Sequence, residues 1–241
     1  MNADLSGRVA LVTGAGRGIG RAISLSLADA GARMFLTARS ADQLEDTARE
    51  IRARGREVEI LPADVSREKD VASVFETLQK RFGRLDVLVN NAGQGFVGPL
   101  AELPVSALDT MMAVNVRGVF LFCQKAMQMM IPARSGYIVN IASVAGVKAY
   151  VLQSAYAASK HAVMGITKGL AAEAQPHGIR VSVVLPGAVD TTLMDALRPD
   201  LDKAALMRPQ DVADAVLFLL SLSETAAVDE IYIRRRSSAP F

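Results

Sequence analysis

The fold class is decided near the start of the chain, by the stretch VALVTGAGRGIG at residues 9–20. Its first residues are aliphatic and predict a buried strand, and glycines follow at positions 14, 16, 18 and 20. Glycines between a strand and a helix let the backbone turn tightly, and the free N–H groups at the helix start attract phosphate. A purely structural turn can also be rich in glycine, but the flanking strand and helix favour a dinucleotide-binding loop. No Lys-Ser or Lys-Thr pair follows, which excludes a mononucleotide P-loop.

The remaining chain alternates short aliphatic runs with longer amphipathic segments, as is typical of a parallel sheet covered by helices. We expect strands at Arg8–Thr13, Arg33–Ala38, Glu57–Pro62, Leu85–Asn90, Tyr137–Ala142, Arg180–Leu185 and Glu230–Arg234. We expect helices near residues 18–30, 41–54, 67–82, 104–131, 153–174 and 209–222. The 241 residues show no break in composition, so we predict one doubly wound α/β domain of the Rossmann type over residues 1–241, with a seven-stranded parallel sheet and helices on both faces.

Composition narrows the class of partner. The balance of 27 basic and 25 acidic residues argues against nucleic-acid binding and favours a small-molecule substrate. The longest apolar runs, such as Val216–Leu220, are too short to cross a bilayer, and no signal peptide is visible. The single cysteine, Cys123, is interpreted as a small buried hydrophobe, and together these features predict a cytoplasmic protein without a metal site. The basic cluster Arg234–Arg236 is interpreted as a solvated strand end or tail, with an interface role as the alternative.

The end of the second strand indicates which dinucleotide binds. A carboxylate at this place accepts hydrogen bonds from the ribose 2′-hydroxyl of NAD, but here the strand ends Leu36-Thr37-Ala38-Arg39-Ser40. The guanidinium of Arg39, with Arg17 in the glycine loop, can clamp a 2′-phosphate bidentately. We therefore expect NADP(H) rather than NAD, although a solvated residue at a helix start would also explain Arg39.

Two further strand ends extend the expected cofactor site. After the third strand, Asp64-Val65 falls where adenine would lie, and the Asp64 carboxylate can accept a hydrogen bond from its amino group. The competing interpretation is that Asp64 caps the helix over 67–82. After the fourth strand comes Asn90-Asn91-Ala92-Gly93, whose small residues and side-chain amides let a flat ligand pass over the backbone, although the same residues would also make an ordinary turn.

The reacting groups are expected after the fifth strand. Tyr156 and Lys160 are four residues apart on a predicted helix, so their side chains project from one face, and Ser143 follows the preceding strand end. A phenol is a poor base at neutral pH, but an adjacent ammonium and a positively charged nicotinamide ring favour its ionised form. Ser143 can hydrogen-bond the substrate oxygen while Tyr156 transfers the proton and the cofactor delivers hydride. The structural alternatives are a half-buried helix aromatic, a surface lysine and a turn serine.

With these residues identified, the chain resembles the short, single-domain branch of the short-chain dehydrogenase/reductase family, with its motifs in order over nearly all 241 residues. The resemblance implies catalytic roles for Asn115, Ser143, Tyr156 and Lys160, Asn115 being the asparagine that holds a water in the family's proton relay. The cofactor-binding residues that it and the residues above predict are Gly14, Gly16, Arg17, Gly18, Ile19, Gly20, Arg39, Asp64, Val65, Asn91, Ala92, Gly93, Tyr156, Lys160, Pro186, Gly187, Val189 and Thr191.

The same resemblance implies a substrate pocket and an assembly. The expected pocket residues, mostly apolar and suited to a nonpolar or extended substrate, are Gln94, Phe96, Val144, Ala145, Gln153, Ala188 and Met194. The irregular segment 189–207 is either a substrate lid or an ordinary connection. Family members are commonly dimers or tetramers, so a homo-oligomer built on the helices near 104–131 and 153–174 is implied. Around the last strand this chain lacks the glycine-rich turn that many relatives have. The resemblance therefore does not specify the oligomer contacts or the lid of this chain.

The expected function is an NADP(H)-dependent oxidoreductase that interconverts a ketone or aldehyde and an alcohol, with Tyr156 as acid and base. It resembles 3-oxoacyl-acyl-carrier-protein reductases and small carbonyl reductases. An alcohol or hydroxy-amino-acid dehydrogenase would use the same residues in the oxidising direction. A noncatalytic regulator that senses NADP is the alternative from a different class. The physiological substrate, the stereochemistry and the favoured direction do not follow from the sequence.

Overall fold

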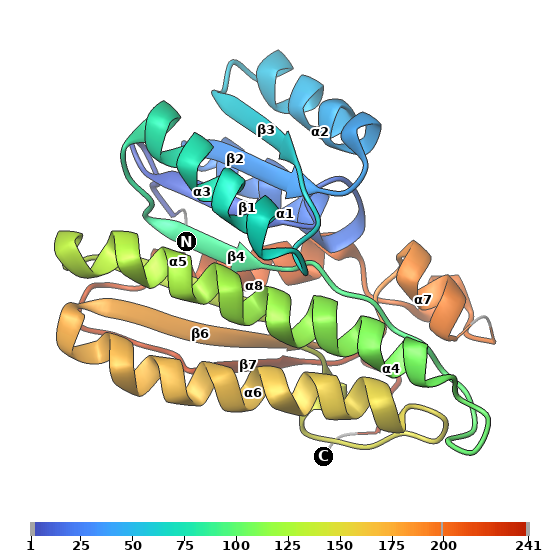
Figure 1. The fold of residues 1–241 in the computed structure, drawn as a ribbon. Coiled ribbons are helices and arrows are strands. Elements are labelled where there is room, and N and C mark those ends of the chain that lie inside the picture. Colours follow the sequence, from blue (N-terminus) through green and yellow to red (C-terminus); the bar gives the residue numbers. More distant parts are fainter. Residues whose placement is uncertain (1–2, 199, 240–241) are drawn as a thin grey trace.

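One parallel sheet carries the seven strands that the structure describes (Figure 1). The computed structural model describes residues 3–198 and 200–239 and orders the strands β3-β2-β1-β4-β5-β6-β7. The strands are β1 (Val9–Thr13), β2 (Arg33–Ala38), β3 (Val58–Pro62), β4 (Val87–Asn90), β5 (Gly136–Ile141), β6 (Ile179–Pro186) and β7 (Glu230–Ile233). The predicted doubly wound parallel sheet is confirmed.

Helices follow the strands in sequence. The α-helices are α1 (Gly18–Asp29), α2 (Ala41–Ala53), α3 (Glu68–Phe82), α4 (Val105–Met111), α5 (Val119–Ala133), α6 (Ser154–Ala174), α7 (Thr192–Leu197) and α8 (Pro209–Ser221). A π-helical segment, η1 (Met112–Gly118), joins α4 to α5, and short 3₁₀ turns are η2 (Val144–Gly146), η3 (Gln175–His177) and η4 (Lys203–Ala205). The segment 189–207, expected to be irregular, thus contains a helix and a 3₁₀ turn.

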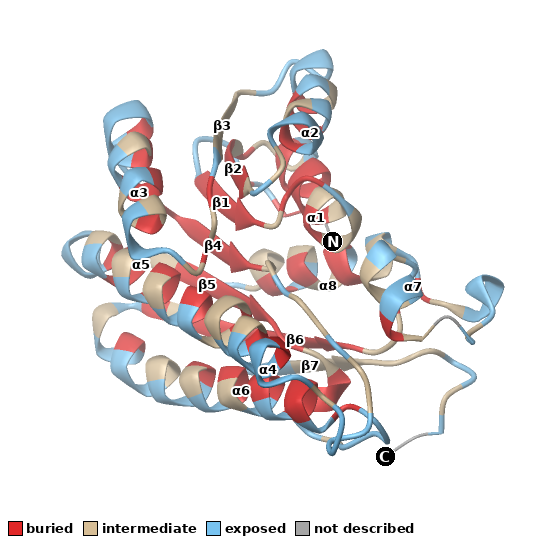
Figure 2. Ribbon diagram, turned by 45° about the vertical axis from the view of Figure 1, so that its right-hand side comes forward, coloured by how far each residue is buried: buried red, intermediate tan, exposed pale blue. Residues whose placement is uncertain are grey.

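The central strands are buried along their length (Figure 2), and their alternate residues belong to separate cores on the two faces of the sheet. In β1, Val9 and Leu11 pack with α3, α5 and α6, while Ala10 and Val12 pack with α1, α2 and α8. The central strands are buried on both faces, which is why their sequences read as continuous aliphatic runs. Two independent apolar layers therefore hold the sheet and fix the strand ends that carry the site.

The strand order reverses between β1 and β4. The chain builds β1 to β3 outward on one side, then crosses to β4 and continues outward on the other. In such sheets the crevice at the carboxyl ends of the two central strands is the ligand-binding position. The loops after β1 and β4 meet there.

The longest helix runs continuously over Val105–Ala133 through α4, η1 and α5. By length and composition alone this 29-residue helix could span a membrane, since the mean hydropathy of its 18-residue window is 1.3. Core helices of soluble proteins meet the same criterion. Here the inner side chains, such as Phe122 and Met130, pack on the sheet beside α3 and α6.

Strand and helix ends differ from expectation by one or two residues, and the start of β4 shows the cause. It begins at Val87 rather than Leu85, because the Asp86 side chain replaces regular strand pairing at this point. Asp86 Oδ2 accepts a hydrogen bond from Val9 N at 2.8 Å, and Asp86 N donates to Val9 O at 2.9 Å.

Candidate active site

The glycine loop lies against the loop after β4. Gly14 and Gly18 adopt φ angles of +66° and +53°, a region that favours glycine. Thr13 Oγ1 accepts hydrogen bonds from the backbone N–H groups of Asn91 and Ala92, each at 3.0 Å. Asn91 Nδ2 donates to the carbonyls of Thr13 at 3.0 Å and Gly14 at 3.3 Å. The segment after β4 is therefore more than a turn, because it fastens the two central strand ends together.

The start of α1 suits a phosphate. Arg17 occupies the N-cap position and no side chain caps the helix, so its first N–H groups face the cavity without a side-chain acceptor. A Cβ at Gly20 would collide with the Gly14 carbonyl and the Asn91 amide, so the helix packs against the loop as closely as its backbone allows. Positive φ angles, close packing and an uncapped helix start together fit a dinucleotide pyrophosphate.

A cavity of about 660 Å³ extends from this loop to the predicted catalytic residues. The expected cofactor residues that line it are Gly14, Gly16, Arg17, Gly18, Ile19, Arg39, Asp64, Val65, Asn91, Ala92, Gly93, Tyr156, Lys160, Pro186, Gly187, Val189 and Thr191. The expected pocket residues that line it are Gln94, Phe96, Val144, Ala145, Gln153, Ala188 and Met194. Gly20 and Asn115 lie beneath the surface of the cavity and support its walls.

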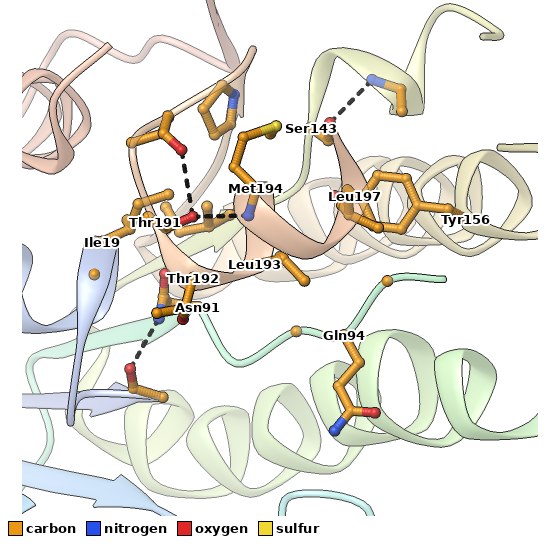
Figure 3. A pocket seen from close by; sticks show the side chains of 18 of the residues that line it. Ile19, Asn91, Gln94, Ser143, Tyr156, Thr191, Thr192, Leu193, Met194 and Leu197 are labelled. Atoms are coloured by element: carbon orange, nitrogen blue, oxygen red, sulfur yellow. Dashed lines mark hydrogen bonds between the residues drawn. The ribbon is translucent and has the colours of Figure 1, made fainter. Parts of the chain in front are cut away.

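At one end of the cavity, Arg39 follows β2 and meets a partner that the sequence did not indicate. With its amide oxygen turned toward Arg39, Gln94 accepts hydrogen bonds from Nη2 at 2.7 Å and Nη1 at 3.1 Å. Gln94 points away from α7 in Figure 3, so its side chain serves this end of the cavity rather than the surroundings of Tyr156. A 2′-phosphate clamped by Arg39 would compete with this contact.

Asp64 is not the cap of the following helix, as the competing interpretation had it, because Arg67 occupies the N-cap of α3. Asp64 Oδ1 instead accepts hydrogen bonds from Ser66 N at 2.9 Å and Ser66 Oγ at 2.7 Å. Burial acts to raise the pKa of Asp64, but these hydrogen bonds and the charges of Arg39 and Arg67 outweigh it and lower the pKa. The carboxylate thus stays ionised at the cavity wall.

The predicted reacting residues converge on the other end of the cavity. Tyr156 and Lys160 lie on one face of α6, with 7 % and 5 % of their surfaces exposed. Ser143 follows β5 and begins η2, where its Oγ accepts a hydrogen bond from Ala145 N at 3.1 Å. The Lys160 ammonium donates to the Ile141 carbonyl at 3.2 Å and lies 5.9 Å from the centre of the Tyr156 ring.

Burial sets the protonation of these groups when the protein is alone. It raises the pKa of the Tyr156 phenol above its ordinary value, and a hydrogen bond with Ser143 offsets part of the rise. It also lowers the pKa of Lys160 to about 8. The net lowering of the Tyr156 pKa that we expected from Lys160 is therefore absent in the protein alone. The phenol is held in its protonated form, ready to donate.

Asn115 sits within the π-helical segment, at a point where irregular helix geometry often accompanies function. Its Oδ1 accepts a hydrogen bond from Gln94 N at 2.8 Å, and its Nδ2 donates to Gln94 O at 2.8 Å and to Ser159 Oγ at 2.9 Å. The side chain thereby joins the loop after β4 to α6. This places Tyr156 and Lys160 relative to the loop.

The helix α7 covers the cavity between the glycine loop and Tyr156 (Figure 3). Thr191 caps it by accepting a hydrogen bond from Met194 N at 3.3 Å, and a Cβ on Gly18 would lie 3.1 Å from Thr191 Cγ2. At the other end, a Cβ on Gly95 would approach both Leu197 and Tyr156. A threonine before a short apolar run is an N-cap signal that would have predicted this helix.

The residues that follow β7 also line the cavity, which the sequence analysis missed. Arg234 and Arg235 belong to its walls together with Ser238, so the interpretation of Arg234–Arg236 as a solvated tail was wrong for the first two arginines. The carboxyl ends of parallel strands share one edge of the sheet, so the segment after β7 had to emerge beside the site.

Comparisons with known proteins agree with this geometry. The family described as short chain dehydrogenase matches residues 8–202. "Uncharacterized oxidoreductase SA2266" of Staphylococcus aureus (strain N315) is 36 % identical over 230 residues, covering 95 % of this chain and 98 % of that protein. A metagenomic short-chain oxidoreductase solved with NADP is 37 % identical, with a TM-score of 0.86 over 98 % of this chain and 100 % of that one.

A third similar protein comes from an archaeon. The alcohol dehydrogenase of Thermococcus sibiricus, solved with 5-hydroxy-NADP, is 31 % identical, with a TM-score of 0.90 over 97 % of this chain and 99 % of that one. Within residues 3–198 and 200–239, no group of three His, Cys, Asp or Glu side chains could hold a metal ion. The chain belongs to the short-chain dehydrogenase family of NAD(P)(H)-dependent oxidoreductases.

Proposed function

We propose that this protein interconverts a ketone or aldehyde and the corresponding alcohol with NADP(H), using Tyr156 as the acid and base. The observation that carries the proposal is the convergence of Ser143, Tyr156 and Lys160 on the cavity that begins at the glycine loop. A buried phenol and a buried ammonium are costly to maintain for stability alone. Their placement beside a dinucleotide loop supports proton transfer coupled to hydride transfer.

In the proposed reduction, the nicotinamide ring when bound supplies a hydride to the carbonyl carbon. The Ser143 hydroxyl donates a hydrogen bond to the carbonyl oxygen and holds it near Tyr156. Tyr156 then transfers its phenolic proton to that oxygen, which completes the alcohol. Lys160 stabilises the phenolate that remains, because an ammonium favours the ionised form of a neighbouring acid. Asn115 holds the loop after β4 and α6 in fixed positions through its hydrogen bonds to Gln94 and Ser159. We include it in the proposed proton relay.

NADP(H) rather than NAD(H) is supported by the strand end after β2. Arg39 and Arg17 line the same part of the cavity, and a guanidinium matches a phosphate bidentately. Two of the similar structures contain NADP or a derivative of it. Replacing Arg39 by Ser is expected to raise the KM for NADPH about tenfold or more while the KM for NADH changes little. Equal effects on both would contradict the assignment.

The segment 189–207 is proposed as a substrate lid. Its helix α7 contacts the glycine loop through Thr191 and the vicinity of Tyr156 through Leu197, so entry of a substrate requires it to move. We also propose a 3-oxoacyl thioester as one candidate substrate among ketones. A cytoplasmic location is proposed because the single cysteine, Cys123, cannot form an internal disulfide, as suits a reducing compartment.

We propose a homo-oligomer, a dimer or tetramer, formed on the helices Val105–Ala133 and Ser154–Ala174. The outer side of the first helix exposes Val105, Met112 and Phe120, with 71 %, 38 % and 52 % of their surfaces accessible. Large apolar side chains gathered on one helix favour burial against another copy. Light scattering on the wild type and Phe120→Glu tests this: dissociation of an oligomer supports the proposal, and a monomeric wild type contradicts it.

The central test is oxidation of NADPH and NADH at 340 nm against ketones, diketones and 3-oxoacyl thioesters, with Tyr156→Phe as the control. Consumption of NADPH by the wild type and silence of the variant support the mechanism. Undiminished turnover by Tyr156→Phe would refute the role of the phenol. Cofactor binding without any turnover, in either direction, would favour a regulator.

A further inference from the structure

The cavity walls carry far more positive than negative charge. Among the described lining residues the only carboxylate is Asp64. The cationic lining residues are Arg17, Arg39, Lys160, Arg198, Arg234 and Arg235. A cleft lined by one sign of charge concentrates ligands of the other sign. The cofactor phosphates account for the arginines near the glycine loop, and catalysis accounts for Lys160, so three arginines have no role yet.

These three arginines lie at the reacting end of the cavity. The backbone after β7 runs beside the segment after β6: Gly187 N donates to Ile233 O at 2.8 Å, and a Cβ on Gly187 would lie 3.4 Å from Arg234 Cα. Gly187 follows β6, which pairs with β5, and the segment after β5 carries Ser143. The segment after β7 thus borders the reacting end, on the far side of the cavity from Arg39.

Two of the three guanidinium groups are engaged within the protein. Arg198 donates from Nε to Asp200 Oδ1 at 2.8 Å and from Nη2 to Oδ2 at 2.7 Å. Arg234 Nη1 donates to the backbone carbonyls of Arg235, Arg236 and Ser238 at 3.1, 3.4 and 2.7 Å. Arg234 is therefore a positioning residue, because it holds the turn Arg235–Ser238 in place.

Arg235 differs from these two. Its Nε donates to Ser238 Oγ at 3.2 Å, which orients the guanidinium. No ion pair joins it to a carboxylate in residues 3–198 and 200–239. The charge of Arg235 helps to lower the pKa of Asp200, but that carboxylate accepts its two side-chain hydrogen bonds from Arg198. Arg235 is half-buried in the cavity wall, and its hydrogen bond to Ser238 holds Nε and not the terminal nitrogens. An oriented guanidinium without a carboxylate partner is a ready site for one.

We propose that Arg235 binds a carboxylate of the substrate, so that the protein acts on oxo acids and the matching hydroxy acids. This deepens the proposed carbonyl reduction and rests on it. Phe96, Val144 and Met194 also line the cavity, so the part of the substrate between its carbonyl and its carboxylate is aliphatic. The expected nonpolar, extended substrate is thereby refined to one with an apolar middle and an anionic end.

The test compares each oxo acid with its methyl ester, which has nearly the same shape without the charge. The substrates are 4-oxopentanoate, 5-oxohexanoate and 6-oxoheptanoate, and the series also measures how far the carboxylate lies from the carbonyl. We expect the wild type to prefer at least one acid over its ester in kcat/KM. Arg235→Gln is expected to lower this acid-to-ester ratio about ten- to a hundredfold, as loss of a charge-assisted hydrogen bond would.

Arg236→Gln is the matched control, because Arg236 is adjacent and exposed and its side chain is not in the cavity wall. It should leave the ratio unchanged. An unchanged ratio in Arg235→Gln, or a wild type that prefers every ester, overturns the proposal. A raised KM for NADPH in Arg235→Gln with an unchanged ratio also overturns it, because the arginine would then serve the cofactor.

A binding measurement separates this proposal from the reaction itself. Hexanoate has no carbonyl to reduce, and calorimetry with the NADP⁺-loaded protein measures its binding directly. Weaker binding to Arg235→Gln than to the wild type and Arg236→Gln supports the site, and equal binding to all three overturns it. Failure of the wild type to reduce any acid, ester or member of the ketone panel refutes the proposed reaction. Reduction of panel members or esters with no effect at Arg235 refutes only the carboxylate site.

Discussion

Replacing Lys160 by Met should make the protein more stable and inactive. The side chain is 5 % exposed, and the one hydrogen bond recorded for its ammonium goes to the Ile141 carbonyl. Burial alone accounts for the fall of its pKa from 10.5 to about 8. A lysine pKa that is depressed in the folded state means that folding disfavours the charged form. The folded protein therefore bears a cost at neutral pH, where the ammonium is charged.

The size of the effect follows from the pKa. The fall corresponds to about 3 kcal/mol of destabilisation at neutral pH. Methionine keeps the length and the apolar stem of the side chain but removes the hydrogen bond to Ile141, which costs about 1 kcal/mol. The net gain for Lys160→Met is about 2 kcal/mol, or roughly 4–8 °C in Tm for a domain of this size.

The gain should depend on pH in a defined direction. Between about 8 and 10.5 the unfolded lysine still binds a proton that the folded one has lost, so wild-type stability rises through this range. The advantage of Lys160→Met therefore shrinks as pH rises through this range and vanishes near its top. Above 10.5 the variant should be the less stable protein, because it still lacks the hydrogen bond.

Urea unfolding of the cofactor-free protein at several pH values measures these differences. Lys168→Met is the control, since Lys168 lies on the same helix but is 68 % exposed and pairs with Glu230 at 3.3 Å. Its stability should change by less than about 0.5 kcal/mol. If Lys160→Met is no more stable than the wild type at neutral pH, or if its gain is independent of pH, the reasoning from burial is refuted.

Three further outcomes are expected. Gly20→Ala should cost about 2 kcal/mol of stability and weaken NADPH binding, because a Cβ would strike the Gly14 carbonyl; an unchanged Kd by fluorescence titration would contradict this. Asn115→Leu should cost about 2–4 kcal/mol in urea unfolding, because it removes three hydrogen bonds, and wild-type stability would show that the bridge is dispensable. The kcat/KM for reduction should fall as pH rises through about 8, where Lys160 loses its proton, and a profile that stays flat to about pH 10 would exclude this lysine as the controlling group.

The sheet could be predicted from the sequence because its strands are buried on both faces. A doubly buried strand must be aliphatic throughout, and glycine, proline or polar residues mark each end. The glycine loop, the residue after β2 and the Tyr156–Lys160 pair were placed by the same rule, that ligands bind at carboxyl strand ends. Those positions depend on topology, which the alternation of strands and helices already specifies.

Other features depend on contacts between side chains distant in sequence. The π-helical segment around Asn115 leaves the apolar periodicity of Val105–Ala133 nearly intact, so nothing in the sequence signals it. The contact between Gln94 and Arg39 joins two loops whose separation is set by the folded sheet. Asp64 could be read as a helix cap because an acidic residue near a helix start is common, and only the structure shows Arg67 in that position.

The junction between β1 and β4 divides the protein into two halves that the cofactor would link. The β1–β4 strand pair has the fewest paired residues in the sheet. It has three paired positions, against five for β1–β2 and six for β5–β6. The hydrogen bonds between Thr13 and the loop after β4 close a span of nearly eighty residues. A dinucleotide lying across this seam opposes its opening, and at a hundred times its Kd it would stabilise the folded state by about 2.7 kcal/mol. The strand pair with the fewest paired positions is thus also the one that ligand binding would reinforce, so resistance to proteolysis should follow cofactor saturation.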